Sequence, residues 1–254
     1  PYDVVGDMSY HEGVRKSGLM DDGTYNFDHL YTNIAKDISS AEKIVNQETI
    51  LGGSDFAYTG YPTFNSPWEL GDAEVKAGFN IILHATNHTL DKGLKGVENC
   101  LSFWKTYHPD TPVLGINETE EDYENIYVYE KEGFKIAFLN YTYGTNGIPI
   151  PDSKPYIVNM LDKDKITADV TKAKQLADMV IVLRPVYFNA AVLDCSSPGL
   201  LPFIKICVQC YIFVGIIQTC LNFLTDPELI LRTFLCATTI GTVSLALHGK
   251  TLFE

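Results

Sequence analysis

The segment FNIILHATNHTLD, residues 79–91, is the most informative part of the sequence. Its first six residues are mostly apolar and rich in branched side chains, which predicts a buried parallel β-strand at 79–84. The strand is followed by Asn87 and His88, whose side chains offer an amide oxygen and an imidazole. In open α/β sheets, ligands bind at the carboxyl ends of the strands. The stretch therefore predicts an α/β fold with a functional site just after residue 84.

Short apolar segments alternate with longer amphipathic ones before residue 184, a pattern typical of a layered α/β fold. The strands are predicted near 2–5, 43–45, 79–84, 112–115, 125–130, 134–140 and 179–183. The helices are predicted at 28–38, 67–77, 93–107 and 163–177, with Asn26, Ser66-Pro67, Asp91 and Asp162 as their starting signals. The short turn at 131–133 contains Gly133 and predicts a β-hairpin, so a purely parallel sheet is not expected.

Composition narrows the classes of partner. The chain has 254 residues, 46% of them hydrophobic, which allows a sizeable core. Its formal charge of −13 argues against nucleic acid as a partner, because binding to the phosphate backbone needs clustered Lys and Arg. The chain begins with Pro1 and a strand follows at once. We therefore expect a fragment whose natural start, with any signal peptide or anchor, lies upstream.

The composition changes near Arg184-Pro185. Residues 1–184 contain 16 basic and 28 acidic side chains, whereas residues 185–254 contain only 3 and 4, and five of the six cysteines lie after residue 190. We therefore predict two parts, 1–184 and a hydrophobic, Cys-rich tail at 185–254. The tail has an uncharged run at 206–224, just long enough for a membrane span, but its Gln and Asn residues weaken that interpretation. The Cys207-x-x-Cys210 spacing, without a matching second pair, is a weak indication of a metal or redox site.

Polar residues stand at the ends of three predicted strands. Asp7 follows the first, Asn46 and Glu48 follow the second, and Asn87 with His88 follow the third. Hard divalent ions such as Mn or Mg prefer the oxygens, and Zn or Fe would also accept the imidazole. Two such ions need a bridging carboxylate and activate water for attack on a phosphoryl-like centre. Each residue taken alone could equally be a turn residue, a solvated carboxylate or a helix cap.

Other side chains are weaker candidates for the functional site. His84 lies within an apolar strand and is expected to be a hydrogen-bonded core residue, and His11 is not expected to reach the site. Residues 141–155 are rich in Gly, Asn, Pro and Tyr and predict a long functional loop, in which Tyr141, Tyr143 and Asn146 could line a substrate groove or simply pack.

Several motifs together resemble the poly-gamma-glutamate capsule synthesis protein CapA family, of the metallo-dependent phosphatase-like superfamily. They are Gly6-Asp7, 46–49 (NQET), 64–67 (FNSP), 85–93 (ATNHTLDKG), 113–117 (VLGIN), 137–144 (AFLNYTYG) and 178–183 (DMVIVL). The resemblance implies a four-layer α/β/β/α sandwich. It also implies metal ligands at Asp7, Glu48 and Asn87, with Glu48 bridging, and His88 as general acid. Asn46, Asn65 and Tyr143 are the expected substrate-binding residues.

The chain departs from this family after residue 183. There the family continues into Pro-His-Trp-Gly and later carries Gly-x-His-Pro-His, both of which supply metal-binding histidines; here the sequence reads Arg184-Pro185-Val186-Tyr187. The sandwich and its metal site are therefore expected to be incomplete. The favoured hypothesis for the tail is a frameshift, a gene-end error or a fusion junction, and the alternative is a genuinely divergent second half.

The resemblance implies a cell-envelope protein, on the extracytoplasmic face of the membrane, that helps to make or export poly-gamma-glutamate or a related anionic polymer. Its partners would be that polymer and other capsule synthesis proteins. If it is an enzyme, divalent ions (Mn, Zn, Fe or Mg) would activate water, and His88 would protonate the leaving group. The alternatives are a non-catalytic scaffold that binds the polymer and a truncated, inactive product.

Overall fold

The computed structural model describes residues 2–185, 212–218, 234–237 and 243–246, and from residue 185 onward only their backbone. The chain folds into two compact units. The first contains residues up to Asn125 and Asn140–Leu161, and the second contains Ile126–Leu139 and the residues from Asp162 onward. Each unit is described by itself.

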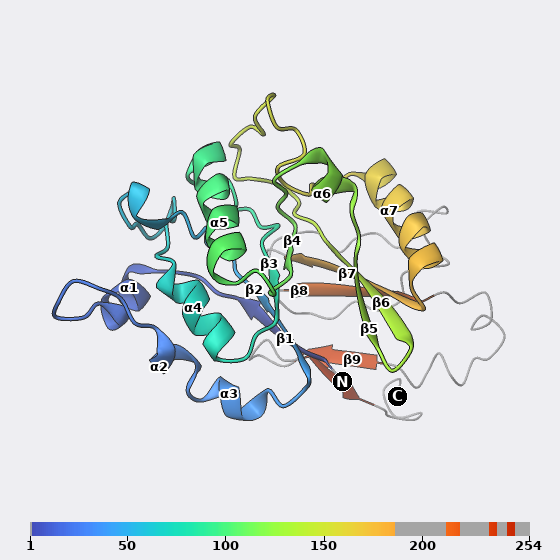
Figure 1. The fold of residues 1–254 in the computed structure, drawn as a ribbon, viewed down its shortest axis with the longest axis horizontal. Coiled ribbons are helices and arrows are strands. Elements are labelled where there is room, and N and C mark those ends of the chain that lie inside the picture. The colour runs from blue at the N-terminus through green and yellow to red at the C-terminus, as the bar shows by residue number, and fades with distance from the viewer. Residues whose placement is uncertain (1, 186–211, 219–233, 238–242, 247–254) are drawn as a thin grey trace, which may run out of the picture. The chain divides into compact units, whose positions relative to one another are not determined.

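A parallel four-stranded sheet forms the centre of the first unit (Figure 1). Its order is β1 (Tyr2–Asp7), β2 (Glu42–Asn46), β3 (Ile81–Leu83) and β4 (Val113–Leu114). All four strands were predicted, and β3 is shorter than the segment 79–84. Since the strands are parallel, their carboxyl ends meet at one edge, where the predicted site residues follow. An α/β fold with a parallel sheet is therefore confirmed.

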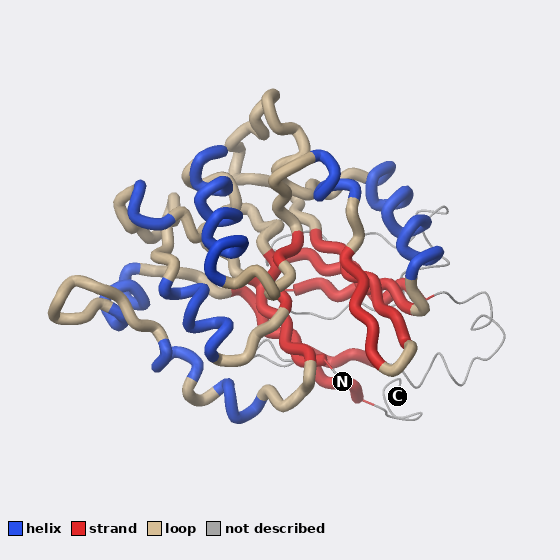
Figure 2. Tube along the Cα trace, viewed as in Figure 1, coloured by secondary structure: helices blue, strands red, loops and turns tan. Residues whose placement is uncertain are grey.

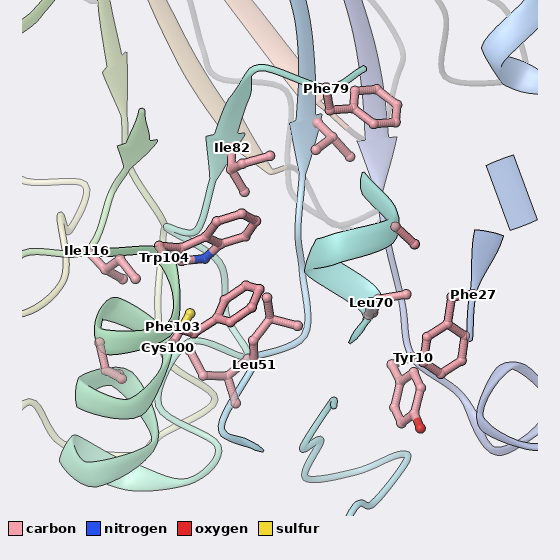
Figure 3. Packing of buried hydrophobic residues seen from close by; sticks show 14 of the residues in the cluster. Tyr10, Phe27, Leu51, Leu70, Phe79, Ile82, Cys100, Phe103, Trp104 and Ile116 are labelled. Carbon is pink, nitrogen blue, oxygen red and sulfur yellow. The ribbon is translucent and has the colours of Figure 1, made fainter. Parts of the chain in front are cut away.

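The hydrophobic core of this unit lies between the sheet and two helices, α4 (Glu69–Lys76) and α5 (Gly93–Tyr107). Val5, Val45 and Ile82 supply the sheet side of the core. Leu70 comes from α4, whereas Cys100, Phe103 and Trp104 come from α5, and Figure 3 shows Cys100 and Phe103 beside Leu51. Alternate residues on the opposite face, Val4, Ile44 and Ile81, are buried as well, as is usual for parallel sheets.

The helices differ from the predictions in three ways. The segment 28–38 forms two short helices, α2 (Asp28–Tyr31) and α3 (Ile34–Asp37), rather than one. Thr32 and Asn33, which separate them, have low helix propensity, and the Thr32 hydroxyl bonds back to the Asp28 carbonyl. The helices α1 (Glu12–Gly18), η1 (Gly53–Asp55) and α6 (Glu120–Glu124) were not predicted. The helix α4 begins after Trp68, two residues beyond Ser66.

The second unit holds a sheet in the order β5 (Tyr127–Lys131), β6 (Phe134–Asn140), β7 (Met179–Pro185) and β8 (Ile212–Gln218). The predicted hairpin is confirmed, because β5 and β6 are antiparallel. Glu132 and Gly133 between them have φ angles of 53° and 79°, as a tight two-residue turn requires. The helix α7 (Lys163–Leu176) begins as predicted directly after Asp162, whose carboxylate accepts a hydrogen bond from the Lys165 amide.

Only three short strands of the predicted tail are described: β8, which pairs antiparallel with β7, and the antiparallel pair β9 (Phe234–Ala237) and β10 (Val243–Ala246). Figure 2 draws the rest of this region in grey. Cys207, Cys210 and most of the uncharged run 206–224 lie outside the described residues. Within the described part of the chain, no helix is both long and apolar enough to span a bilayer.

Candidate functional site

Two strand ends of the first unit bring Asp7 and Asn46 together. The register of β1 and β2 shifts after Val5, and this irregularity sets Asp7 opposite Asn46. The Asn46 Nδ2 group donates a hydrogen bond of 2.5 Å to Asp7 Oδ1. The Asn46 side chain is almost fully buried, and its own Oδ1 has no hydrogen-bond partner. An unpaired buried oxygen is costly, so this atom indicates a place for a cation or a donor.

A second carboxylate, Glu48, lies close to Asp7. The Glu48 side chain accepts a hydrogen bond from the Ser9 hydroxyl, and its backbone carbonyl accepts one of 2.7 Å from Thr86 Oγ1. Burial and the neighbouring Glu48 carboxylate raise the pKa of Asp7 to about 7, although the Asn46 hydrogen bond and His88 lower it in part. Two carboxylates so close together need positive charge between them if both are to be ionised.

The segment between β3 and α5 holds Asn87 and His88 in place. Its start is fixed by Asn140, whose Oδ1 accepts a hydrogen bond of 2.9 Å from the Ala85 amide. Thr89 then closes the turn, since its hydroxyl donates to the His84 carbonyl at 2.6 Å and accepts from the Thr86 amide at 2.9 Å. Asn87 and His88 are 1% and 3% exposed, so the turn rather than solvent sets their orientation.

His88 forms a buried pair with Asp91. Its Nδ1 lies 2.7 Å from Asp91 Oδ2, which also accepts a hydrogen bond of 2.7 Å from the Phe64 amide. The Phe64 ring packs edge-on against the imidazole at a centroid distance of 4.7 Å. A carboxylate at this distance favours the tautomer with the proton on Nδ1, which leaves Nε2 as the nitrogen that can exchange a proton with a ligand.

Asn146, from the long loop after β6, contacts both of these residues. Its Oδ1 accepts a hydrogen bond of 3.1 Å from Asn87 Nδ2, and its Nδ2 lies 3.2 Å from His88 Nδ1. The first unit thus gathers Asp7, Asn46, Glu48, Asn87 and His88 from the ends of three neighbouring parallel strands, with Asn146 beside them.

Comparison with protein families gives this site a context. The family of the bacterial capsule synthesis protein PGA_cap matches residues 3–184, which include every residue of the site. The chain belongs to this family. The predicted CapA resemblance is therefore confirmed, and the match to the PGA_cap family ends where the chain was predicted to depart from it.

Solved structures similar to this PGA_cap chain include a phosphatase from Mycoplasma pneumoniae and the NAD nucleotidase NadN from Haemophilus influenzae. The phosphatase is 16% identical with a TM-score of 0.37, over 71% of this chain and 53% of that one. NadN is 14% identical with a TM-score of 0.32, over 61% of this chain and 27% of that one. The chain thus spans about half the length of the phosphatase and about a quarter of NadN. A search of the curated proteins found no match.

Asp91 is the residue that the sequence interpretation assigned wrongly. It was predicted to cap α5, but that helix begins after Lys92 without a side-chain cap, and Asp91 instead binds His88 and the Phe64 amide. The signal that could have shown this role is the spacing of His88 and Asp91, which are three residues apart in one tight turn. Ser9, which holds Glu48, has no recognisable signal in the sequence.

The remaining residues predicted from the sequence, Asn65, Tyr143 and His84, differ in their burial and in their contacts. Asn65 is fully buried, and its Nδ2 donates to the carbonyls of Gly53, Phe56 and Ala57, so it ties the loop before α4 together. Tyr143 is 45% exposed. Substrate contacts by Asn46, Asn65 and Tyr143 stay predictions. His84 is a core residue as predicted, because its Nε2 accepts a hydrogen bond of 2.9 Å from Trp104 Nε1.

The side chains at this site offer oxygen atoms, which hard divalent cations prefer, but the number of carboxylates is small. Asp7 and Glu48 supply carboxylates, Asn87 an amide, and the Asn46 oxygen is unpaired. Among the described residues, no group of three or more His, Cys, Asp or Glu is placed to hold a metal ion. The site therefore depends on amide oxygens and on the two carboxylates, and its two-ion form stays a prediction.

Proposed function

We propose that this PGA_cap protein acts in the synthesis or export of poly-gamma-glutamate, or a related anionic capsule polymer, through a metal-dependent hydrolytic site. The observation that carries the proposal is the buried His88–Asp91 pair next to the Asp7 and Glu48 carboxylates. An acid–base group beside two crowded carboxylates is the arrangement that hydrolysis of a phosphoryl or acyl centre requires.

Each side chain of the site has a distinct task in this proposal. Asp7, Glu48 and the amide oxygen of Asn87 would hold the cation, which when bound polarises the reacting centre and lowers the pKa of water. His88 keeps one proton on Nδ1 for Asp91 and delivers another from Nε2 to the leaving group. Asp91 is buried and orients the His88 ring through Nδ1, and the Phe64 ring packs edge-on against the imidazole.

Hydrolysis assays on two probes test the proposal: p-nitrophenyl phosphate and poly-gamma-glutamate, each with added Mn²⁺, Zn²⁺, Fe²⁺ or Mg²⁺. We expect His88→Gln to lower turnover roughly 10²–10⁴-fold, the usual worth of a general acid. Asp91→Asn should lower turnover as well, because a neutral amide is a weaker acceptor for the Nδ1 proton and orients the ring less firmly. His29→Gln is the matched control, since His29 is exposed and bonds to Ser17. Hydrolysis that is equally fast in all variants, or absent with every ion, would contradict the enzymatic proposal.

A non-catalytic scaffold is the second candidate. It is supported by the sparse cation ligands and by the absence from the sequence of the two family histidine motifs. A scaffold would bind poly-gamma-glutamate equally well in the presence of EDTA, and titration calorimetry with the polymer measures this. Loss of polymer binding on removing divalent ions would count against it.

The proposed place of action is the extracytoplasmic face of the cell envelope, with other capsule synthesis proteins as partners. The family assignment supports this, because capsule polymers are assembled at the bacterial surface. Fractionation of cells that make the natural protein, followed by protease treatment of intact spheroplasts, tests it. Protection of the protein from the protease would contradict the proposed location.

A further inference from the structure

A tight turn places Asn146 with little freedom. Asn146 and Gly147 have φ angles of 53° and 78°, and the Ile148 amide donates a hydrogen bond of 3.0 Å to the Thr145 carbonyl. Two successive residues with positive φ define a turn that strongly favours the sequence Asn-Gly. The Thr145 hydroxyl also donates to the Ile148 carbonyl at 2.6 Å. The turn therefore fixes the backbone from which the Asn146 side chain extends.

Asn146 determines which way the Asn87 amide faces. The oxygen and nitrogen ends of an Asn side chain have nearly the same shape, so hydrogen-bond partners decide their orientation. Asn146 Oδ1 accepts from Asn87 Nδ2 at 3.1 Å. Because the Asn87 nitrogen donates to Asn146, the Asn87 oxygen points away from Asn146. The oxygen is the atom of the amide that binds a hard cation. The reverse orientation would present an NH₂ group to the cation.

His88 does not depend on Asn146 in the same way. Its Nδ1 carries at most one proton, and Asp91 Oδ2 at 2.7 Å is a charged acceptor for it, whereas the Asn146 atom at 3.2 Å is Nδ2, a donor that cannot accept this proton. A charge-assisted hydrogen bond is roughly twice as strong as a neutral one. Asp91 therefore holds His88, and the distinct role left to Asn146 is toward Asn87.

A similar arrangement occurs at the Asp7 carboxylate. Asn46 Nδ2 donates to Asp7 Oδ1, and the Asn46 oxygen is left unpaired in a buried position. In both cases a neighbouring oxygen accepts a hydrogen bond from the amide nitrogen, so the amide oxygen faces away from that neighbour. We infer that Asn146 is a positioning residue, which keeps the Asn87 oxygen toward the cation site of the proposed function, on which this inference rests.

Two substitutions of Asn146 separate this role from loop stability. Asn146→Gly removes the side chain and tolerates the positive φ, so the turn is retained. Asn146→Asp keeps an acceptor oxygen and also tolerates this conformation. Thr145→Ala is the matched control, because it removes a hydrogen bond of the same turn without touching Asn87.

Calorimetric titration of the whole protein with Mn²⁺ gives the first readout. Loss of a partner that orients a ligand typically weakens metal binding about 10–100-fold. We expect a loss of that size in Asn146→Gly, recovery in Asn146→Asp, and affinity within about threefold of the wild type in Thr145→Ala. Unchanged affinity in Asn146→Gly, or an equal loss in Thr145→Ala, would overturn the inference.

Side-chain amide exchange, measured by NMR without metal, gives the second readout. One hydrogen bond is worth about 1 kcal/mol, so the Asn87 amide protons should exchange several-fold faster in Asn146→Gly than in the wild type or Asn146→Asp. Equal exchange rates would overturn the inference on their own. A wild-type protein that binds no Mn²⁺ but shows the exchange difference would refute the proposed metal site and leave the orientation of Asn87 established.

Discussion

Glu74 shows how a single residue can work against the stability of its own fold. It lies on α4 with no solvent exposure, and neither carboxyl oxygen has a hydrogen bond of good geometry. Burial raises the pKa of Glu74 well above its ordinary value, and the neighbouring Tyr31 lowers it only in part. Since the folded protein holds this proton more tightly than the unfolded chain does, its stability falls as pH rises above about 4.5.

Glu74→Gln should therefore stabilise the protein in a pH-dependent way. The amide stays neutral at every pH, so the variant should exceed the wild type in free energy of unfolding at pH 8, and the difference should shrink toward pH 4.5. Urea unfolding at both pH values measures it, and each unit of pKa difference corresponds to about 1.4 kcal/mol. A difference that does not change with pH would mean that the pKa of Glu74 is the same in the folded protein as in the unfolded chain, which would contradict the raised pKa.

At the scale of elements, Gly115 after β4 allows three segments to approach one another. Its φ is +94°, and a Cβ atom there would come within 2.2 Å of Asn140 Oδ1 and 2.5 Å of the Ala85 amide nitrogen. These two groups form the hydrogen bond that fixes the start of the Asn87–His88 turn. Only glycine fits this position without displacing the segment that carries the site.

Gly115→Ala should destabilise the protein by about 2–4 kcal/mol, from the strained backbone and the steric overlap together. It should also weaken Mn²⁺ binding, because the Ala85–Asn140 hydrogen bond must break. Gly144→Ala is the control, since a Cβ there would meet nothing within 4 Å. Thermal unfolding measures the first effect and calorimetry the second. A Gly115→Ala variant as stable as the Gly144→Ala variant would contradict the packing described.

The strands could be predicted from the sequence far better than the hydrogen bonds between loops. Branched apolar runs such as Ile81–Leu83 identify buried strands on their own, and Asp162 marks the start of α7. The role of Asp91 depends on the Phe64 amide, 27 residues away, and that of Asn146 on Asn87, 59 residues away. Such partnerships arise from how loops meet after folding, and no local pattern encodes them.

At the scale of the whole molecule, the family match and the charge distribution coincide. The PGA_cap match ends at residue 184, and the acidic part of the chain ends there too. Because most of residues 186–254 lie outside the described structure, the origin of this region stays a prediction. Sequencing the natural gene beyond codon 184 tests it: a downstream frame encoding His-Trp-Gly and His-Pro-His would support the frameshift, and its absence would contradict it.

In the proposed function, Asp7, Glu48 and Asn87 form a cation site at the carboxyl ends of the parallel strands. Elemental analysis of the purified protein, beside its Asn87→Ala variant, tests this most directly. The purified wild-type protein should contain a stoichiometric divalent metal, about one or two ions per chain, and Asn87→Ala should lose it. A wild-type protein that contains no metal after purification with added Mn²⁺ or Zn²⁺, or a variant that retains it fully, would contradict the claim.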